Sequence, residues 1–130
     1  MRTLQPQGWP RPRGYSNGIE AEGRLIFVAG QIGWDETGAF KARGFAAQFR
    51  QALVNTLAVL KEASAGPEHI TRMTWFITSR EEYSASLAEL GAAWKEVMGR
   101  NYPAMSVIIV SGLVEPDAKI EIETTAVVSP

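Results

Sequence analysis

Hydrophobic residues recur with a helical period in two stretches of the chain. From residue 44 to residue 63 they follow one another at steps of three or four, at Phe45, Phe49, Leu53, Leu57 and Leu60. From residue 81 to residue 98 similar steps connect Tyr83, Leu87, Leu90, Trp94 and Met98. This spacing puts the apolar side chains on one face of a helix, so it predicts two amphipathic helices. Gly66 and Pro67 indicate where the first of them ends.

Segments rich in β-branched and aromatic residues predict five strands. Two lie within residues 15–31, and the short polar turn between them at residues 20–23 indicates a hairpin. The others fall within residues 69–79, 104–113 and 118–128. The resulting order, β-β-α-β-α-β-β, is typical of an α+β domain with both helices on one face of the sheet. We expect residues 1–130 to form this single domain, with the proline- and glycine-rich residues 1–14 as an extended arm.

Two of the predicted strands are apolar on both faces. Residues 105–110 place Val107 and Ile109 on one face and Ile108 and Val110 on the other, and residues 24–30 repeat the pattern. A strand with water on one side alternates apolar with polar residues instead. Because two helices cover one face only, the other face requires a partner, and copies of the same chain are the simplest one. The sequence thus predicts an obligate homo-oligomer.

Composition and charge exclude several classes of protein. Hydrophobic residues make up 45% of the chain and charged residues 21%, as in ordinary globular domains. Thirteen basic and fourteen acidic residues are scattered and leave a net charge of -1, so no nucleic-acid surface is expected. The lack of cysteine excludes disulfides, thiol nucleophiles and cysteine-held metals. His69 has no partner at metal-ligand spacing, so we expect no metal site.

No stretch of the chain approaches the roughly 20 apolar residues that a bilayer span requires. The first residues also lack the apolar region of a signal peptide. A cytoplasmic protein without a membrane partner is therefore the expectation.

The last predicted strand carries the candidate acid-base chemistry. Ile120 and Ile122 alternate with Glu121 and Glu123, so the apolar pair fits beneath the helices and both carboxylates fall on the face assigned to the subunit interface. Loss of solvent at such an interface favours proton transfer by a carboxylate. Alternatively, the two glutamates are exposed, or paired with Lys or Arg across the interface.

Five motifs follow one another in an order that is specific for a known family. They are "GYSNGI", "VAGQIGWDETG", "FAAQFRQALVNTLAVLKEASAG", "YPAMS" and "KIEIETTAVV". Over about residues 14–128 the chain resembles the reactive intermediate deaminase family, the Rid, RidA-like or YjgF-like proteins. The resemblance implies a chorismate mutase-like fold in a homotrimer, with small-molecule pockets between neighbouring subunits. It also implies hydrolysis of reactive enamines or imines to ammonia and a ketoacid, without metal or organic cofactor.

The family's site is only partly retained. On this resemblance, Tyr15, Gly30 and Gln31 contribute to substrate binding, and Glu121 is the catalytic residue that positions and deprotonates the attacking water. The deaminating members carry an arginine that clamps the substrate carboxylate where this chain has Met105. A thioether offers neither the charge nor the N–H donors of a guanidinium. Activity on small amino-acid-derived imines is therefore expected to be weak or absent.

Three further substrate-binding positions depart from the family in the same direction. Ala29 stands in place of a serine, Ala88 in place of an asparagine, and Val107 in place of a cysteine. With Met105, these changes predict an apolar pocket with adaptable walls instead of an anion clamp. Met105 is equally compatible with plain core or interface packing.

Aromatic and basic side chains near the expected pocket leave further alternatives. Trp34 could stack on a planar substrate, although loop packing explains it as well. Tyr15 could donate a hydrogen bond to a ligand or to the backbone. Arg11 or Arg13 could replace the lost charge if the arm folds over a neighbouring pocket.

Two functions remain open. The first is an imine or enamine deaminase with altered substrate preference, acting on a more apolar or aromatic molecule such as an aminomuconate-type ring-cleavage product. The second is a non-catalytic trimeric protein that binds a small molecule or regulates another process. The retained Glu121 and Tyr15 favour the first, and the loss of the clamp favours the second.

Overall fold

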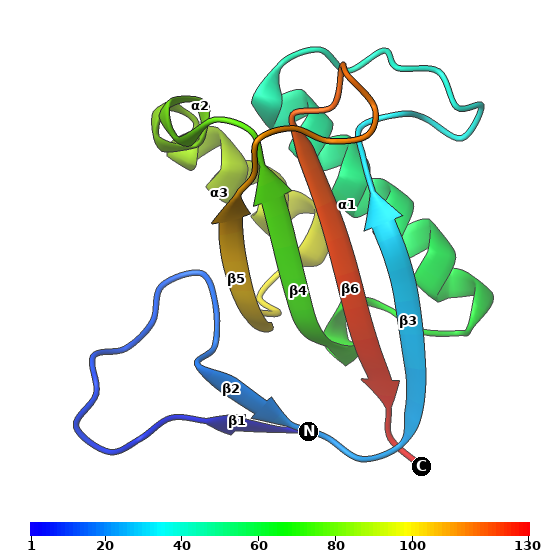
Figure 1. Ribbon diagram of the computed structural model, residues 1–130. Helices are drawn as coiled ribbons and strands as arrows, with labels where there is room; N and C mark the ends of the chain where they lie inside the picture. The colour runs from blue at the N-terminus through cyan, green and yellow to red at the C-terminus, as the bar shows by residue number, and fades with distance from the viewer.

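Four strands form the central sheet of the protein, whose computed structural model describes residues 1–130 (Figure 1). β3 (Arg24–Gln31), β6 (Ile120–Val128), β4 (Ile70–Ile77) and β5 (Ala104–Ile109) lie side by side in that order. β6 runs antiparallel to both of its neighbours, whereas β4 and β5 are parallel. β3 and β5 are therefore the edge strands.

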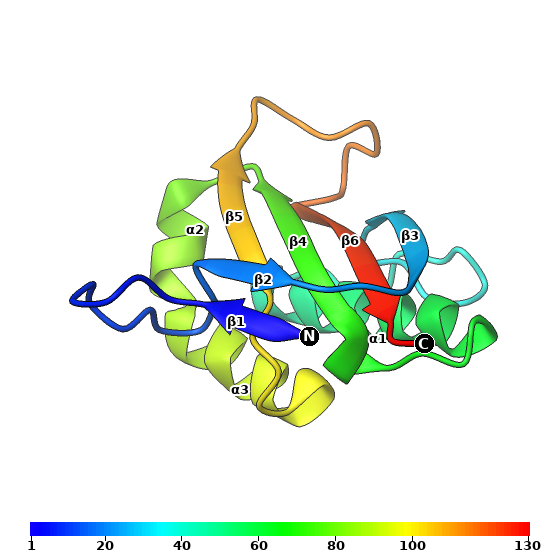
Figure 2. The same ribbon diagram turned by 90° about the horizontal axis from the view of Figure 1, so that it is seen from below.

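The helices all cover the same face of this sheet, as the two views in Figures 1 and 2 agree. α1 (Phe45–Glu62) packs against β3, β6 and α3 (Leu87–Met98). α2 (Arg80–Ala85) and α3 form the crossover between the parallel strands β4 and β5, and η1 (Pro67–His69) is a single 3₁₀ turn before β4. The α+β class predicted from the sequence, with its helices on one face, is confirmed. No helix combines the length and the apolar character needed to cross a bilayer.

The core lies between the helices and the sheet. Its fully buried large apolar side chains come from both layers: Phe49, Leu53, Leu60, Met73, Ile77, Met98, Ile120 and Ile122. The alternation predicted for the last strand is confirmed, because Ile120 and Ile122 face the helices while Glu121 and Glu123 lie on the other face.

The predicted hairpin between the first two strands is wrong. β2 (Gly18–Glu20) pairs with β1 (Arg2–Leu4), a strand of the arm, in a separate two-stranded ribbon. At Gly23 (φ 147°) the chain passes so close to the end of β6 that a Cβ would collide with the carbonyl of Val128. The turn therefore directs the chain out of the ribbon and into β3. Residues 1–14, predicted as an extended arm, also contribute the strand β1 to this ribbon.

The two predicted helices also differ in detail from the observed ones. The second is divided at Ser86 (φ -107°), whose N–H bonds to the carbonyl of Tyr83, three residues back. The first ends at Glu62, and the residue that takes the left-handed conformation after it is Ser64 (φ 55°), ahead of Gly66. A serine performs here the role that the sequence pattern assigns to a glycine.

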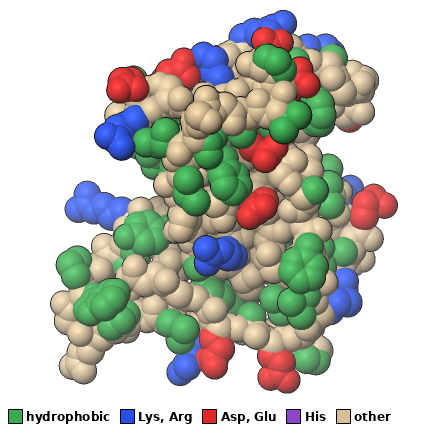
Figure 3. Space-filling view, in the orientation of Figure 1, with side chains coloured by type: hydrophobic (Ala, Val, Ile, Leu, Met, Phe, Trp, Pro, Cys, Tyr) green, Lys and Arg blue, Asp and Glu red, His purple; other side chains and the backbone are tan.

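The face of the sheet turned away from the helices has no cover within the chain. Figure 3 looks onto this open face and shows hydrophobic side chains around acidic and basic groups. Phe27 is 74% exposed and Leu25 58%, and Ile108 on the opposite edge strand is also exposed. Large apolar side chains exposed to this degree on one face indicate an interaction site.

A buried glutamine joins α1 to the loop that precedes β6. Nε2 of Gln48 donates to the carbonyl oxygens of Asp117 at 3.0 Å and of Arg43 at 3.3 Å, and its Oε1 accepts the N–H of Lys119 at 2.8 Å. The side chain is fully buried, so no water substitutes for these bonds if it is removed. Gln48 thus satisfies backbone groups at the start of β6.

Replacing Gln48 by leucine should lower the free energy of unfolding by about 3 kcal/mol, because buried backbone groups lose their partners. Urea unfolding followed by circular dichroism measures this change. Gln51→Leu is the matched control, because the Gln51 amide bonds only Asn55 on the same helix, and it should stay within about 0.5 kcal/mol of wild type. A Gln48→Leu variant as stable as wild type would contradict the assignment.

Candidate functional site

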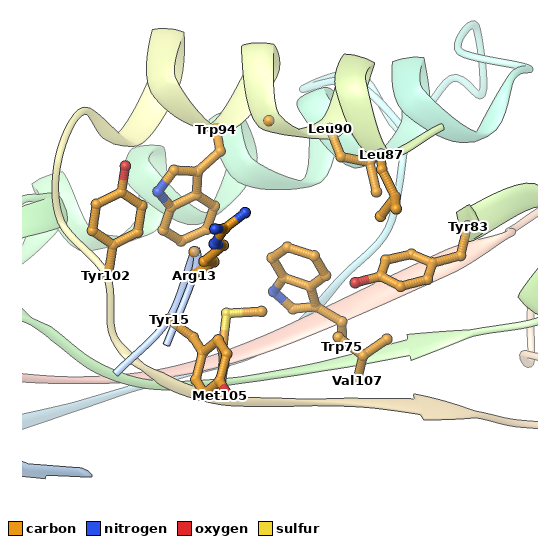
Figure 4. A pocket seen from close by; sticks show the side chains of 12 residues that line it. Arg13, Tyr15, Trp75, Tyr83, Leu87, Leu90, Trp94, Tyr102, Met105 and Val107 are labelled. Carbon is orange, nitrogen blue, oxygen red and sulfur yellow. The ribbon is translucent and has the colours of Figure 1, made fainter. Parts of the chain in front are cut away.

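A cavity of about 480 Å³ lies at the edge of the sheet, between β5 and the helices of the crossover (Figure 4). The sheet contributes Trp75, Met105 and Val107 to its wall, and the helices contribute mainly Tyr83 and Trp94. The cavity forms because the apolar stripe of α3 extends beyond β5, the edge strand, and so has no further strand to cover. We call this cavity the aromatic pocket.

Ring contacts fix the aromatic wall. Trp75 lies edge-on to Phe49 at 4.8 Å between ring centroids and is tilted against Trp94 at 6.0 Å. Trp94 is in turn nearly parallel to Tyr102, at 6.4 Å and 16°. Contacts of this geometry are favourable between aromatic rings. The wall is therefore preformed by packing against the core.

Two donors in this wall have no acceptor. The Nε1 atoms of Trp75 and Trp94 are buried without a hydrogen-bond partner, and the hydroxyl of Thr124 is the one other buried side-chain group in this state. Both tryptophans are 6% exposed. Figure 4 shows the Trp75 nitrogen turned into the pocket, towards the side of Met105, and the Trp94 nitrogen turned towards Tyr102. A buried donor without an acceptor costs about 1–3 kcal/mol.

The arm brings one cation to the mouth of the pocket. The N–H of Ser16 donates to the carbonyl of Pro103 at 2.9 Å, and its hydroxyl donates to the carbonyl of Tyr102, which docks the arm beside β5. Arg13 and Tyr15 thereby line the pocket, and Arg13 is its one charged residue. The guanidinium of Arg13 takes part in none of the ion pairs of the chain. Arg11 lies instead at a separate hollow enclosed by the arm.

Glu121 lies on the open face, against a bulge in β3. The ladder between β3 and β6 shifts register between Val28 and Gln31, so Ala29 and Gly30 form the bulge. A Cβ at Gly30 would lie 2.7 Å from Cδ of Glu121 and 2.9 Å from its Oε2, so this position admits only glycine while the carboxylate stays in place. Nε2 of Gln31 bonds back to the carbonyl of Ala29 at 3.1 Å.

The residues predicted from the sequence fall into two groups near opposite edges of the sheet. Tyr15, Met105 and Val107 share the aromatic pocket on the helix side. The second group, on the side of the bulge, consists of Ala29, Gly30, Gln31 and Glu121. Within one chain, Met105 and Glu121 do not share a cavity. The register aligns Met105 through Met73 with Thr124, which is buried on the helix side of β6, whereas Glu121 projects from the other face of that strand.

Two predicted residues belong to neither group. Ala88 is exposed on α3, and its neighbour Leu87 lines the pocket in its place. Trp34 is 40% exposed in the loop after β3, where its carbonyl accepts a hydrogen bond from Nδ2 of Asn55 at 2.7 Å. No group of three or more histidine, aspartate or glutamate side chains is placed to hold a metal ion.

The sequence pattern did not single out most of the pocket wall. Trp75, Tyr83 and Trp94 follow the periods of their elements, so the sequence assigns them to the core. A helical period shows that side chains share a face, but not that this face extends beyond the last strand. The sequence feature that indicates this pocket wall is the concentration of large aromatic residues within residues 75–102.

Fold and site together define a small α+β domain with an apolar, aromatic ligand pocket at the edge of a sheet that is covered on one face. The model of the endoribonuclease L-PSP family matches residues 10–128. The chain belongs to this family, which confirms the resemblance to the Rid and YjgF proteins.

Relatives cover nearly the whole chain. A RutC family protein of Synechocystis is 34% identical over 98% of this chain and 96% of its own. A protein of Salmonella typhimurium named 2-iminobutanoate/2-iminopropanoate deaminase is 30% identical over 97% of each chain. Imine deamination is therefore supported for the family.

Solved structures agree with the fold. A protein of unknown function from the Rid family, YyfB of Yersinia pestis, superposes with a TM-score of 0.86 at 30% identity, over 98% of both chains. TdcF of E. coli, solved with bound serine, superposes with a TM-score of 0.69 at 29% identity, over 99% of this chain and 100% of its own. A member of the family thus binds a small molecule.

The loop that carries Trp34 should lose stability in acid through Asp35. The Thr37 hydroxyl, at 2.6 Å, and then the Lys41 ammonium, at 3.0 Å, hold the pKa of the Asp35 carboxyl well below its ordinary value of 3.8. A carboxyl with a depressed folded-state pKa stabilises the fold above pH 3.8, and this contribution declines as the pH falls further. The difference in melting temperature between wild type and Asp35→Asn should therefore shrink from pH 6 to about pH 2.

Calorimetric scans at several pH values measure this difference. Glu36→Gln removes the adjacent charge without touching these hydrogen bonds and serves as the control, for which no such convergence is expected. A constant difference between wild type and Asp35→Asn at all pH values would refute the prediction.

Proposed function

We propose that the protein hydrolyses the C=N bond of a reactive imine or enamine and releases ammonia, at a site completed by two copies of the chain. The observation that carries the proposal is the placement of the Glu121 carboxylate against Gly30 on the open face. The Glu121 side chain is only partly buried. Water therefore reaches its carboxylate from the open face.

The chemistry requires a single base that returns its proton. Glu121 takes a proton from water as the water oxygen bonds to the imine carbon, and the π electrons of the C=N bond move to nitrogen. Glu121 returns this proton to nitrogen, which gives a carbinolamine. It then transfers the hydroxyl proton to nitrogen in the same way, the C–N bond breaks, and ammonia leaves a carbonyl group behind. Imine and water thus give carbonyl compound and ammonia, and an enamine enters the same route after protonation at its β-carbon. General acid-base catalysis of this kind contributes about 10²- to 10⁴-fold.

Association of chains supplies the second half of the site. The aromatic pocket and Glu121 lie on opposite sides of the sheet, so the carboxylate that serves a pocket comes from a neighbour. The exposed Leu25 and Phe27 provide apolar area for this contact. Arg72 and Glu123 border a hollow on the same face and are free of ion pairs within the chain, which leaves them available for a neighbour. The homotrimer implied by the family resemblance is the assembly that we propose.

A non-catalytic ligand-binding protein is the second candidate. It is favoured by Met105, because the pocket wall carries a thioether in place of a charged group and has no acid or base of its own. Both candidates place a ligand in the aromatic pocket, and they differ in whether Glu121 reacts with water there.

Ammonia release distinguishes the two candidates. Imines generated by an amino-acid oxidase from small and from aromatic amino acids, and 2-aminomuconate, should yield ammonia faster with the protein than in buffer for at least one substrate. Glu121→Gln keeps the shape of the side chain and should lower this rate about 100-fold or more. Glu62→Gln, at the exposed end of α1 and outside every ion pair of the chain, is the control and should retain the rate. Rates equal to buffer for every substrate would leave only the binding protein.

Disrupting the open face should separate the chains. Wild type is expected to sediment at about three times the chain mass of 14.2 kDa in analytical ultracentrifugation. Phe27→Glu places a charge on the most exposed apolar side chain of β3 and should yield monomers that have also lost activity. Val114→Glu changes an even more exposed apolar residue, in the loop before β6, and should remain associated. A wild-type monomer at micromolar concentration would overturn the shared site.

A further inference from the structure

We infer that the ligand of the aromatic pocket is an aryl-substituted 2-imino acid, or the 2-oxo acid formed from it. Its ring would lie among the aromatic side chains, its imine nitrogen or keto oxygen would accept the N–H of Trp75, and its carboxylate would bind Arg13. The reaction rests on the proposed function, whereas the choice of ligand rests on the pocket alone.

The ring is indicated by the shape and chemistry of the wall. Nine of the twelve residues that line the cavity are hydrophobic, and its volume of about 480 Å³ exceeds what a three-carbon imino acid fills. The faces and edges of Trp75, Trp94 and Tyr83 are held in place by the core. A planar ring is the group that matches such a wall in both shape and quadrupole.

The acceptor is indicated by Trp75. This side chain is 94% buried, its N–H has no partner, and Figure 4 shows it directed into the pocket towards the side of Met105. Met105 is unbranched and partly buried, so it can move aside more easily than a branched side chain. A ligand that displaces its thioether and offers a nitrogen or oxygen supplies the bond that the protein lacks. A purely hydrocarbon ligand leaves the donor unpaired.

The anionic group is indicated by Arg13. This guanidinium lies at the pocket, is free of ion pairs and offers a bidentate fork to a carboxylate. It comes from the arm and not from β5, so a carboxylate bound there lies at the mouth of the pocket while the rest of the molecule points inwards. An aryl 2-imino acid carries carboxylate, acceptor and ring on consecutive atoms and meets all three requirements.

Benzoylformate, a stable aryl 2-oxo acid, is the probe for this inference, with isothermal titration of the full chain in its native assembly. It should bind at least 10-fold more tightly than pyruvate, which has the same oxo acid without the ring, and than cyclohexylglyoxylate, which has a non-aromatic ring. Equal affinity for benzoylformate and pyruvate would overturn the inference.

Variants test the two polar contacts separately. Arg13→Gln should weaken benzoylformate binding about 10-fold or more, because a charged hydrogen-bonded pair is lost, and should leave the uncharged acetophenone unaffected. Arg11→Gln, the neighbouring arginine of the arm, is the matched control and should bind as wild type does. Equal losses of benzoylformate affinity in Arg13→Gln and Arg11→Gln would mean that the ligand responds only to the net charge of the arm. That result would refute a direct contact between Arg13 and the carboxylate.

Trp75→Phe removes the N–H and keeps a ring, and should weaken benzoylformate binding about 10-fold. Because this variant also shortens a buried side chain, the second test replaces Trp75 by 3-benzothienylalanine, which has the shape of tryptophan with sulfur in place of the N–H group. This substitution should lower the affinity similarly and leave the melting temperature of the free protein unchanged. Unchanged affinity would overturn the role of the donor.

The outcomes separate the ligand from the reaction. Tight benzoylformate binding without ammonia release from any imine refutes the deaminase and supports the ligand class. Ammonia release from the alanine-derived imine, with benzoylformate bound no better than pyruvate, supports the deaminase and refutes the ligand class.

Discussion

A four-stranded sheet has two faces, and this chain has helices for only one of them. That constraint decides where each chemical group lies. Side chains alternate between the two faces along each strand, and the register of β4, β5 and β6 places Met105 on the core side and Glu121 on the open face. The exposed Phe27 and Leu25 on that face are the energetic reason for our proposal that a second copy covers it. The proposed site between chains is thus a consequence of how a half-covered sheet buries its apolar surface.

The two halves of the proposed site are positioned in different ways. The aromatic pocket is built from the core outwards, since Trp75 packs on Phe49 and Trp94 packs on Trp75, and so its walls share the rigidity of the interior. The position of Glu121 depends on backbone, because the bulge at Ala29 and Gly30 leaves the room that its carboxylate occupies. A preformed apolar wall and a carboxylate in a restricted position are both suited to binding without reorganisation.

Loss of the arginine at Met105 does not leave the pocket without a cation. The arm, docked through Ser16 onto the segment before β5, brings Arg13 to the mouth. Arg13 at the mouth would hold the anionic end of a ligand there, and the unpaired N–H of Trp75 would bind an acceptor deeper inside. A cation on β5, at the position of Met105, would orient the ligand differently. The ligand selectivity that we propose therefore depends on the aromatic wall and on the arm together.

The sequence by itself determined the elements and the side of the sheet to which each residue belongs, because the periods of 3.6 and 2 residues are local properties of helices and strands. It determined the α+β class, the burial of Ile120 and Ile122, and the face of the sheet on which Glu121 lies, whereas a partner on the open face stays a prediction. It did not determine that β2 pairs with β1, since the close approach of Gly23 to Val128 joins residues more than 100 positions apart. Only the tertiary structure showed that Arg13, Trp75 and Trp94 share a pocket and that Met105 and Glu121 do not, because the distance between elements is set by packing and not by any pattern within one element.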